Sequence, residues 1–398
     1  MTAIAAADLA ELLSDLVPIG LDEAGATTRL AWTREDEEAA AWFARQSALL
    51  GRTMERDPAG NLWAPPDAPP PWWAVGSHLD SVRAGGRFDG ALGVAAGFAV
   101  AARANVPVAV VSFADEEGAR FNTPTFGSRA LTGRLDVDDA LGRVDGAGVS
   151  LGDAMAEVGV DPEQLSRAPE WLDRLSGFLE LHVDQTRDVA AARAPAGVVS
   201  RLAARLRLQA EVAGRADHAG TTPREERHDA LGAAARLIVR AEAEAAQRLG
   251  MVFTATRLEV EPNAPTTVPS HARLWLDARA AEADAVRSWR DVVAAEADRV
   301  AAEAGVEVAL REAAWSAGTT FPEAPRAALR RALPPRTPEL VCYAGHDAGV
   351  IATERPAGMV LVRNETGVSH APDEDVALED AAVAAAGLLE AVEALAAP

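Results

Sequence analysis

Histidine and aspartate residues gather in one glycine-rich segment, residues 76–90, which has the sequence GSHLDSVRAGGRFDG. The segment follows an apolar run, residues 72–75, that predicts a buried strand. His78, Asp80 and Asp89 therefore lie just after a strand. Imidazole and carboxylate groups without a thiolate suit Zn²⁺ or Mn²⁺ in a hydrolytic site. The alternative interpretation is a polar loop over the edge of a sheet.

Acidic or imidazole side chains accompany three other predicted strands. They are residues 106–113, followed by Glu116 and Glu117; residues 178–183, which include His182; and residues 359–362, followed by His370. Taken alone, a solvated acidic turn or a structural histidine would explain each segment. In open α/β sheets, however, ligands collect outside the carboxyl ends of the strands. The four segments together therefore predict a single site.

The composition excludes several classes of function. The 398 residues exceed what one hydrophobic core usually supports, so we expect two domains. The formal net charge of -22 argues against nucleic acid or an anionic membrane as a partner. The sequence contains no lysine, so every fully charged basic side chain is an arginine. This excludes a Schiff-base lysine and the lysine of a P-loop.

The cysteine content and the N-terminal segment both bear on the compartment. Cys342 is the one cysteine, which excludes an intrachain disulfide and a thiolate-rich zinc site. Its thiol is either a nucleophile near His346 or a small buried apolar group. Residues 1–13 carry acids where a signal peptide needs positive charge, and no apolar run approaches about 18 residues. We therefore expect a cytoplasmic protein.

The remaining pattern predicts one domain that is interrupted by another. Residues 1–50 predict two helices, with Thr33 as the N-cap of the second. Residues 205–314 predict a strand, a helix, two strands, a helix and a final strand near 306–310, which together make an α+β unit. The predicted domains are residues 1–204 and 315–398, which form the interrupted domain, and the insertion at 205–314.

The chain resembles the N-carbamoyl-L-amino acid hydrolase, allantoate amidohydrolase and β-ureidopropionase family, within the dinuclear-metal aminopeptidases and deacylases. The matching motifs, in order, are GSHLDSVRAGGRFDG, FADEEGARF, GSRALTG, HVDQ, DHAGTTP, EPNAPTTVP, LDAR, AGHDA and GVSHAPDE. The resemblance implies an α/β fold with a metal-dependent, aminopeptidase-like catalytic domain, in which helices flank a mixed sheet. A smaller α+β lid and dimerisation domain would interrupt it, and the protein would be a homodimer.

The resemblance also implies two divalent metal ions and their ligands. His78, Asp89 and His182 would hold one ion, and Asp89 would bridge to a second ion held also by Glu117 and His370. Zinc or manganese is expected, and this donor set also tolerates cobalt or nickel. Glu116 would be the general base that takes a proton from water and passes it to the leaving nitrogen. Asp80 would either orient a ligand imidazole or cap a loop.

Residues of the insertion would supply most of the substrate recognition. His218 matches the histidine that polarises the scissile carbonyl, often across a dimer interface, although it could also be a turn residue. Arg279 matches the arginine that grips the substrate carboxylate, a bidentate task that suits a guanidinium group. Gln185 and His346 match pocket positions. Thr266 stands where the family usually has an asparagine that binds the carboxylate or the ureido group.

The departures from the family pattern spare the expected metal ligands and base. They are Asp184 and Thr186 in HVDQT, Thr266, Arg224, and the pair Arg363 and Asn364; several of these are expected to line the pocket. The expected reaction is metal-dependent hydrolysis of a non-peptide C–N bond in a small ureido substrate with a carboxylate. An N-carbamoyl-L-amino acid or allantoate fits this description. The alternatives are a peptidase or N-acyl amino acid deacylase on the same scaffold, and a catalytically silent binding protein.

Overall fold

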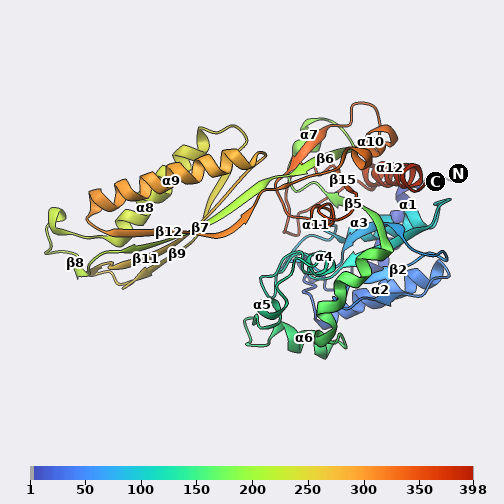
Figure 1. The fold of residues 1–398 in the computed structure, drawn as a ribbon, viewed down its shortest axis with the longest axis horizontal. Coiled ribbons are helices and arrows are strands. Elements are labelled where there is room, and N and C mark those ends of the chain that lie inside the picture. The colour runs from blue at the N-terminus through green and yellow to red at the C-terminus, as the bar shows by residue number, and fades with distance from the viewer. Residues whose placement is uncertain (1–3, 398) are drawn as a thin grey trace. The chain divides into compact units, whose positions relative to one another are not determined.

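The structure, a computed structural model, describes residues 4–397 of the chain. The chain forms two compact units: unit 1 comprises Met1–Ser200 and Thr320–Pro398, and unit 2 comprises Arg201–Thr319. Figure 1 traces both units, from blue at the start of the chain to red at its end. Among the described residues, no helix is both long and apolar enough to cross a membrane.

Unit 1 is built on a mixed sheet that has nine strands among the described residues. The strand order is β1-β2-β4-β3-β5-β15-β6-β13, and β14 pairs with β6. The strands are β1 (Glu55–Arg56), β2 (Leu62–Ala64), β3 (Trp72–His78), β4 (Val108–Phe113), β5 (Leu175–Val183), β6 (Ala196–Leu202), β13 (Thr319–Thr320), β14 (Glu339–Cys342) and β15 (Ala357–Val362). Strands β4, β3, β5 and β15 run parallel to one another. The predicted α/β fold with a mixed sheet is confirmed.

The four parallel strands explain why the chemistry-bearing segments meet. Strands β3, β4 and β15 are buried at every position, because both faces of the sheet are covered, and this is why they appear as continuous apolar runs in the sequence. Their carboxyl ends point to the same edge of the sheet. The segments that follow them therefore gather at that edge.

Helices cover both the sheet and the loops at its edge. They are α1 (Ala6–Leu16), α2 (Arg34–Leu49), α3 (Ala91–Ala101), α4 (Phe126–Leu131), α5 (Val137–Leu141), α6 (Leu151–Glu157), η1 (Pro162–Arg174), α7 (Asp188–Ala191), α10 (Glu323–Ala332), α11 (Asp347–Ile351) and α12 (Leu378–Ala396). Helix α3 is buried at every residue and packs against β3, α1 and α12. A Cβ at Gly93 would lie 2.1 Å from the backbone oxygen of Leu181, so glycine permits this close approach. The Thr33 side chain caps α2 by accepting a hydrogen bond from the Asp36 amide, as predicted.

Unit 2 is a four-stranded antiparallel sheet, in the order β12-β7-β11-β9, that packs against two long helices. Its elements are β7 (Ala204–Ala213), β8 (Asp217–His218), η2 (Arg224–Glu226), α8 (Ala230–Ala246), β9 (Val252–Glu261), β10 (Thr267–Val268), β11 (His271–Ala280), α9 (Ala283–Ala304) and β12 (Glu307–Ser316). In Figure 1, α8 and α9 run along the sheet. Alternate residues of β7 and β11 are buried under these helices, which explains the period of two in the sequence.

Several strands differ from the sequence-based expectation, among them β12 and β6. The strand predicted near residues 306–310 continues to Ser316 as β12. It is an edge strand with many exposed positions, so its hydrophobic signal fades after Leu310. Strand β6 was not predicted, and it pairs antiparallel with β15. Its pairing partner lies far along the chain, so local sequence does not reveal it.

Candidate metal centre and active site

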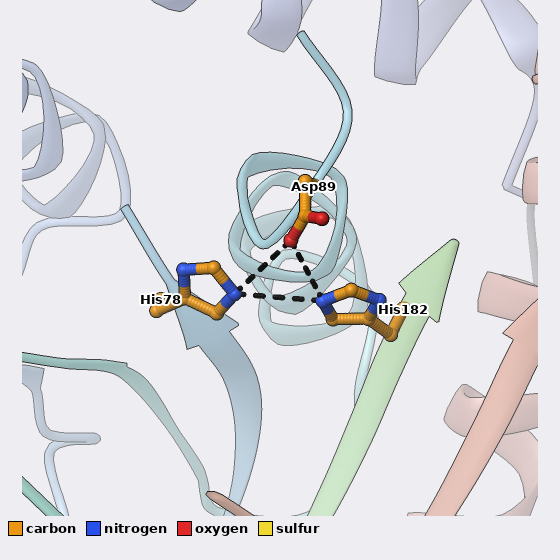
Figure 2. Close-up of side chains that lie close together, drawn as sticks. All are labelled: His78, Asp89 and His182. Atoms are coloured by element: carbon orange, nitrogen blue, oxygen red, sulfur yellow. Dashed lines mark hydrogen bonds and ion pairs between the residues drawn. The ribbon is translucent and has the colours of Figure 1, made fainter. Parts of the chain in front are cut away.

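Two histidines and an aspartate meet at the carboxyl edge of the unit 1 sheet. His78 is the last residue of β3, His182 lies near the end of the neighbouring strand β5, and Asp89 precedes α3. His182 Nε2 lies 3.0 Å and His78 Nε2 lies 3.4 Å from Asp89 Oδ1. Figure 2 shows the two rings directing their Nε2 atoms, 3.4 Å apart, toward the same carboxylate. All three side chains are buried.

The backbone fixes how both rings present their nitrogens. His78 Nδ1 lies 3.0 Å from the backbone oxygen of Asp80, and His182 Nδ1 lies 3.0 Å from that of Val183. A carbonyl oxygen only accepts hydrogen bonds, so each Nδ1 carries a hydrogen and the neutral ring keeps its lone pair on Nε2. Two Nε2 lone pairs and a carboxylate oxygen, grouped in a buried place, form a donor set that fits a divalent cation.

Asp89 belongs to a second group with Glu117 and His370. His370 Nε2 lies 3.6 Å from Asp89 Oδ2 and 3.4 Å from Glu117 Oε1. Glu117 Oε1 is buried and has no hydrogen-bond partner among the described residues. Burial and the nearby Asp89 charge raise the pKa of Glu117 to about 8, because two buried carboxylates repel each other. A cation between them would remove this cost, so the residues of the second group also fit a metal ion.

The pKa of His182 bears on how metal binding by His78, Asp89 and His182 depends on pH. Burial opposes a charge on His182, but Asp89 outweighs burial and raises the pKa of His182 to about 9. The protein without a cation therefore holds a proton between this ring and the carboxylate. A divalent ion must displace that proton, so metal binding at this place should weaken as the pH falls.

Glu116 lies beside the first group, with Oε2 3.9 Å from His78 Nε2. Burial raises the pKa of Glu116 well above its usual range; His78 offsets this in part, and the carboxylate of Asp347 adds to it. A carboxyl group with a raised pKa can accept a proton from water and release it again near neutral pH. The position and the pKa of Glu116 thus both suit a general base.

Asp80 anchors the loop that carries Glu116 and Glu117. Its two carboxylate oxygens accept hydrogen bonds from the backbone amides of Glu116 and Glu117, at 3.0 and 3.1 Å. Its Oδ1 lies 3.6 Å from His78 Nδ1, which is too long for a hydrogen bond. The Asp80 side chain therefore has the loop-capping role, and the backbone oxygen of Asp80 is the atom that orients the His78 ring.

Cys342 and His346 are both buried in unit 1. The His346 ring centroid is 4.5 Å from that of His182, and neither of its nitrogens has a hydrogen-bond partner within the described part of the chain. Burial and the charge of His182 lower the pKa of His346 well below its usual range, so the ring is neutral. Burial raises the pKa of the Cys342 thiol to about 12, which argues against the nucleophile interpretation.

Gln185 joins the second group, while three other predicted substrate residues belong to unit 2. Gln185 Nε2 donates to Asp89 Oδ2 at 3.2 Å and lies 3.4 Å from His370 Nε2. His218 Nδ1 accepts hydrogen bonds from the amides of Gly220 and Thr221, at 3.0 and 3.1 Å. Its remaining hydrogen is therefore on Nε2, which can donate to a carbonyl oxygen.

The other two predicted residues of unit 2 lie on strand β11 and in the turn before β10. Arg279 Nε donates to Asp277 Oδ1 at 2.9 Å, and Asp277 Oδ2 accepts from Arg207 Nε at 2.8 Å. This contact fixes one edge of the Arg279 guanidinium group. Thr266 is exposed, and its backbone oxygen accepts a hydrogen bond from the Ala219 amide, in the segment of His218.

Several departures from the family pattern support the backbone. Asp184 accepts hydrogen bonds from the amides of Thr186 and Val189, at 2.9 and 3.0 Å. Asn364 Oδ1 accepts from two amides of the loop before His370, and its Nδ2 donates to another backbone oxygen of that loop. Arg363 forms an ion pair with Asp380 on α12. The polar groups of these residues are thus used locally, and the expectation that several departures line the pocket stays a prediction.

Two buried acids near the site received no role from the sequence. Glu180, in β5, accepts hydrogen bonds from Ser77 Oγ at 2.7 Å and from the Ala348 amide at 2.8 Å. It therefore ties β3 and β5 to the start of α11. An acid inside an otherwise apolar strand was the available sequence signal. The other residue is Glu374, the last residue of the GVSHAPDE motif, which contacts the backbone of Asp89.

Comparisons with known proteins show which family and which solved structures the chain is similar to. The model of a family described as Peptidase family M20/M25/M40 matches residues 74–394. The chain is 36% identical to the N-carbamoyl-L-amino acid amidohydrolase of Geobacillus stearothermophilus, covering 96% of this chain and 97% of the relative. It is 29% identical to the allantoate amidohydrolase of Escherichia coli strain K12, covering 94% and 93%. A hydantoinase/carbamoylase family amidase from Burkholderia ambifaria has a similar structure, with a TM-score of 0.85, 31% identity, and coverage of 99% and 98%.

Proposed function

From the premise that the chain belongs to peptidase family M20/M25/M40, we propose that it is a metal-dependent hydrolase of a non-peptide C–N bond. The substrate that fits best is an N-carbamoyl-L-amino acid or allantoate, a small molecule with a ureido group and a carboxylate. One observation carries the proposal: two groups of potential metal ligands share Asp89, and Glu116 lies beside them. Nothing in the reaction calls for a nucleic acid partner.

Two divalent ions are the proposed cofactors. His78, Asp89 and His182 would hold one, and Asp89, Glu117 and His370 would hold the other. Zinc and manganese are proposed first, and the same donors accept cobalt or nickel. When bound, such ions polarise the scissile carbonyl group and lower the pKa of water.

Glu116 is the proposed general base. Its carboxylate would take a proton from the attacking water and then donate it to the nitrogen of the leaving group, which departs as an amine or ammonia. Burial supports this cycle, because it raises the pKa of Glu116 and makes the return of the proton easier. Asp80 supports it by holding the Glu116 amide in place.

Five residues are proposed to contact the substrate. Arg279 would bind the carboxylate, His218 would donate from Nε2 to the scissile carbonyl oxygen, and Thr266 would contribute beside them. Gln185 and His346 would contact the ureido group from unit 1. The fixed Nε edge of Arg279 and the tautomer of His218 support these assignments. Unit 2 is further proposed to act as a lid and dimerisation domain in a homodimer.

The decisive experiment measures product release by metal-loaded protein. The panel contains allantoate, several N-carbamoyl-L-amino acids and N-carbamoyl-β-alanine, and ammonia is measured. Amine release from N-acetyl and N-formyl amino acids is measured in parallel. Glu116→Gln should lower kcat by about 10²- to 10⁴-fold, because the amide cannot accept the proton. Its metal content should equal that of the wild type, since Glu116 is not a proposed ligand.

Each outcome separates the candidate functions. Ammonia from a ureido substrate, lost in Glu116→Gln, supports the proposal. Amine without ammonia would identify a deacylase or peptidase on the same scaffold. If the whole panel stays silent and two metal ions are bound, the substrate lies outside these classes. If the panel stays silent and no metal binds, the chain is a binding protein and the proposal is wrong.

A further inference from the structure

A buried carboxylate joins the two segments that carry Asp89 and His370. Glu374 Oε1 accepts hydrogen bonds from the backbone amides of Phe88 and Asp89, at 3.2 and 3.0 Å. The Glu374 side chain is almost completely buried. It follows His370 by four positions in the same loop. One side chain from the His370 loop therefore fixes the backbone from which the Asp89 carboxylate extends.

The surroundings of Glu374 leave little freedom in this contact. A Cβ at Gly86 would lie 2.3 Å from Glu374 Oε1, so the carboxylate approaches the chain at a place that only glycine leaves open. His370 itself adopts a left-handed backbone conformation, with φ of 56°. Asn364 binds the backbone at the other end of the loop. The loop that presents His370 is thus held by polar side chains on both sides of it.

Simple attachment of the two segments does not require a buried acid. The neighbouring residues Arg87 and Asp375 already link the same segments through an ion pair of 3.0 Å, with side chains 48% and 66% exposed. Glu374 adds a costly contact, because its Oε2 is buried and has no hydrogen-bond partner among the described residues. The cost of burying this oxygen is explained if the contact fixes the spacing of Asp89 and His370.

We propose that Glu374 is a positioning residue that holds Asp89 and His370 at the spacing needed to share the second metal ion. The inference rests on the proposed dinuclear centre and deepens it. Glu374 belongs to neither of the two groups of candidate ligands. It acts through the backbone amide of Asp89, whose Oδ2 and the His370 Nε2 lie 3.6 Å apart. Residues that orient ligands in this way affect metal affinity by about 10- to 100-fold.

The test is a titration of the metal-free protein with Mn²⁺, in which binding is measured by calorimetry and by electron paramagnetic resonance. The wild type should bind two ions and show the magnetic coupling of a close Mn²⁺ pair. Glu374→Ala should keep the first ion, bind the second about 10- to 100-fold more weakly, and lose the coupling. Glu374→Gln should behave as the wild type, because its amide oxygen accepts the same two hydrogen bonds. Asp375→Ala is the matched control and should leave both affinities unchanged.

A variant with a shorter side chain keeps the test decisive if Glu374→Ala does not fold. Three results would overturn the inference. If Glu374→Ala fails to fold, Glu374→Asp, whose acceptor is one methylene group shorter, must show the weaker second site instead. Equal binding of both ions by the folded variants and the wild type would show that Glu374 positions nothing. Equal losses in Glu374→Gln and Glu374→Ala would show that its charge acts rather than its hydrogen bonds. A wild type that binds fewer than two ions would refute the dinuclear centre itself.

Discussion

Gly90 offers a direct test of how the metal-ligand loop is packed. It precedes α3 with φ of 64° and ψ of -51°, a backbone conformation that side-chain-bearing residues rarely adopt. A Cβ at this position would lie 2.4 Å from Cε1, 2.5 Å from Nδ1 and 2.6 Å from Cγ of His78. His78 is completely buried. Gly90→Ala should therefore displace the imidazole.

The expected cost of Gly90→Ala has two parts. The backbone conformation costs about 1–3 kcal/mol for a residue with a Cβ. Forcing a methyl group into a packed interior costs about 1–3 kcal/mol more. The free energy of unfolding should thus fall by about 2–6 kcal/mol, the sum of these two costs. Gly51→Ala is the control, because Gly51 has φ of 71° but a Cβ added there would meet no described atom within 4 Å. The free energy of unfolding of Gly51→Ala should fall only by the cost of the backbone conformation.

The assay combines urea unfolding of the metal-free proteins with a metal titration. Gly90→Ala should unfold at a lower urea concentration than Gly51→Ala, and it should lose affinity for the ion proposed at His78. Gly51→Ala should bind two ions as the wild type does. Equal unfolding midpoints and equal metal affinities in the two variants would refute the packing argument, since both would then respond to backbone strain alone.

Two further predictions follow from groups away from the proposed ligands. Burial raises the pKa of Cys342 to about 12, so its thiol should not react with a disulfide reagent at pH 8 in the folded protein and should react fully in urea. Burial raises the pKa of Asp57 from 3.8 to about 6. The folded protein therefore binds this proton more tightly than the unfolded chain, which stabilises the fold by about 3 kcal/mol below about pH 4. This contribution to the free energy of unfolding is lost as the pH rises through 6. Urea unfolding between pH 4 and 7 should show a smaller decline with pH in Asp57→Asn than in the wild type; equal declines would contradict the assignment.

The sequence by itself determined the fold class and the convergence of the chemistry-bearing segments. Continuous apolar runs predicted strands buried on both faces, and a histidine or an acid after each run predicted a common edge. The inference succeeds because parallel strands share a direction, so residues distant in sequence meet without detailed knowledge of packing. The alternation in β7 and β11 predicted the second sheet for a similar reason.

Only the tertiary structure decided how individual polar atoms are used. The Asp80 carboxylate caps the Glu116 loop while the Asp80 backbone oxygen contacts the His78 ring, and Asp184 accepts hydrogen bonds from the backbone that follows it. Glu374 reaches an amide 285 positions earlier in the chain. These outcomes depend on differences of about 1 Å between atoms in the folded chain, because a hydrogen bond forms only within a narrow range of distances. Residue type and spacing limit which groups can meet, but hydrogen bonding is short-ranged, so the final packing alone selects the partners.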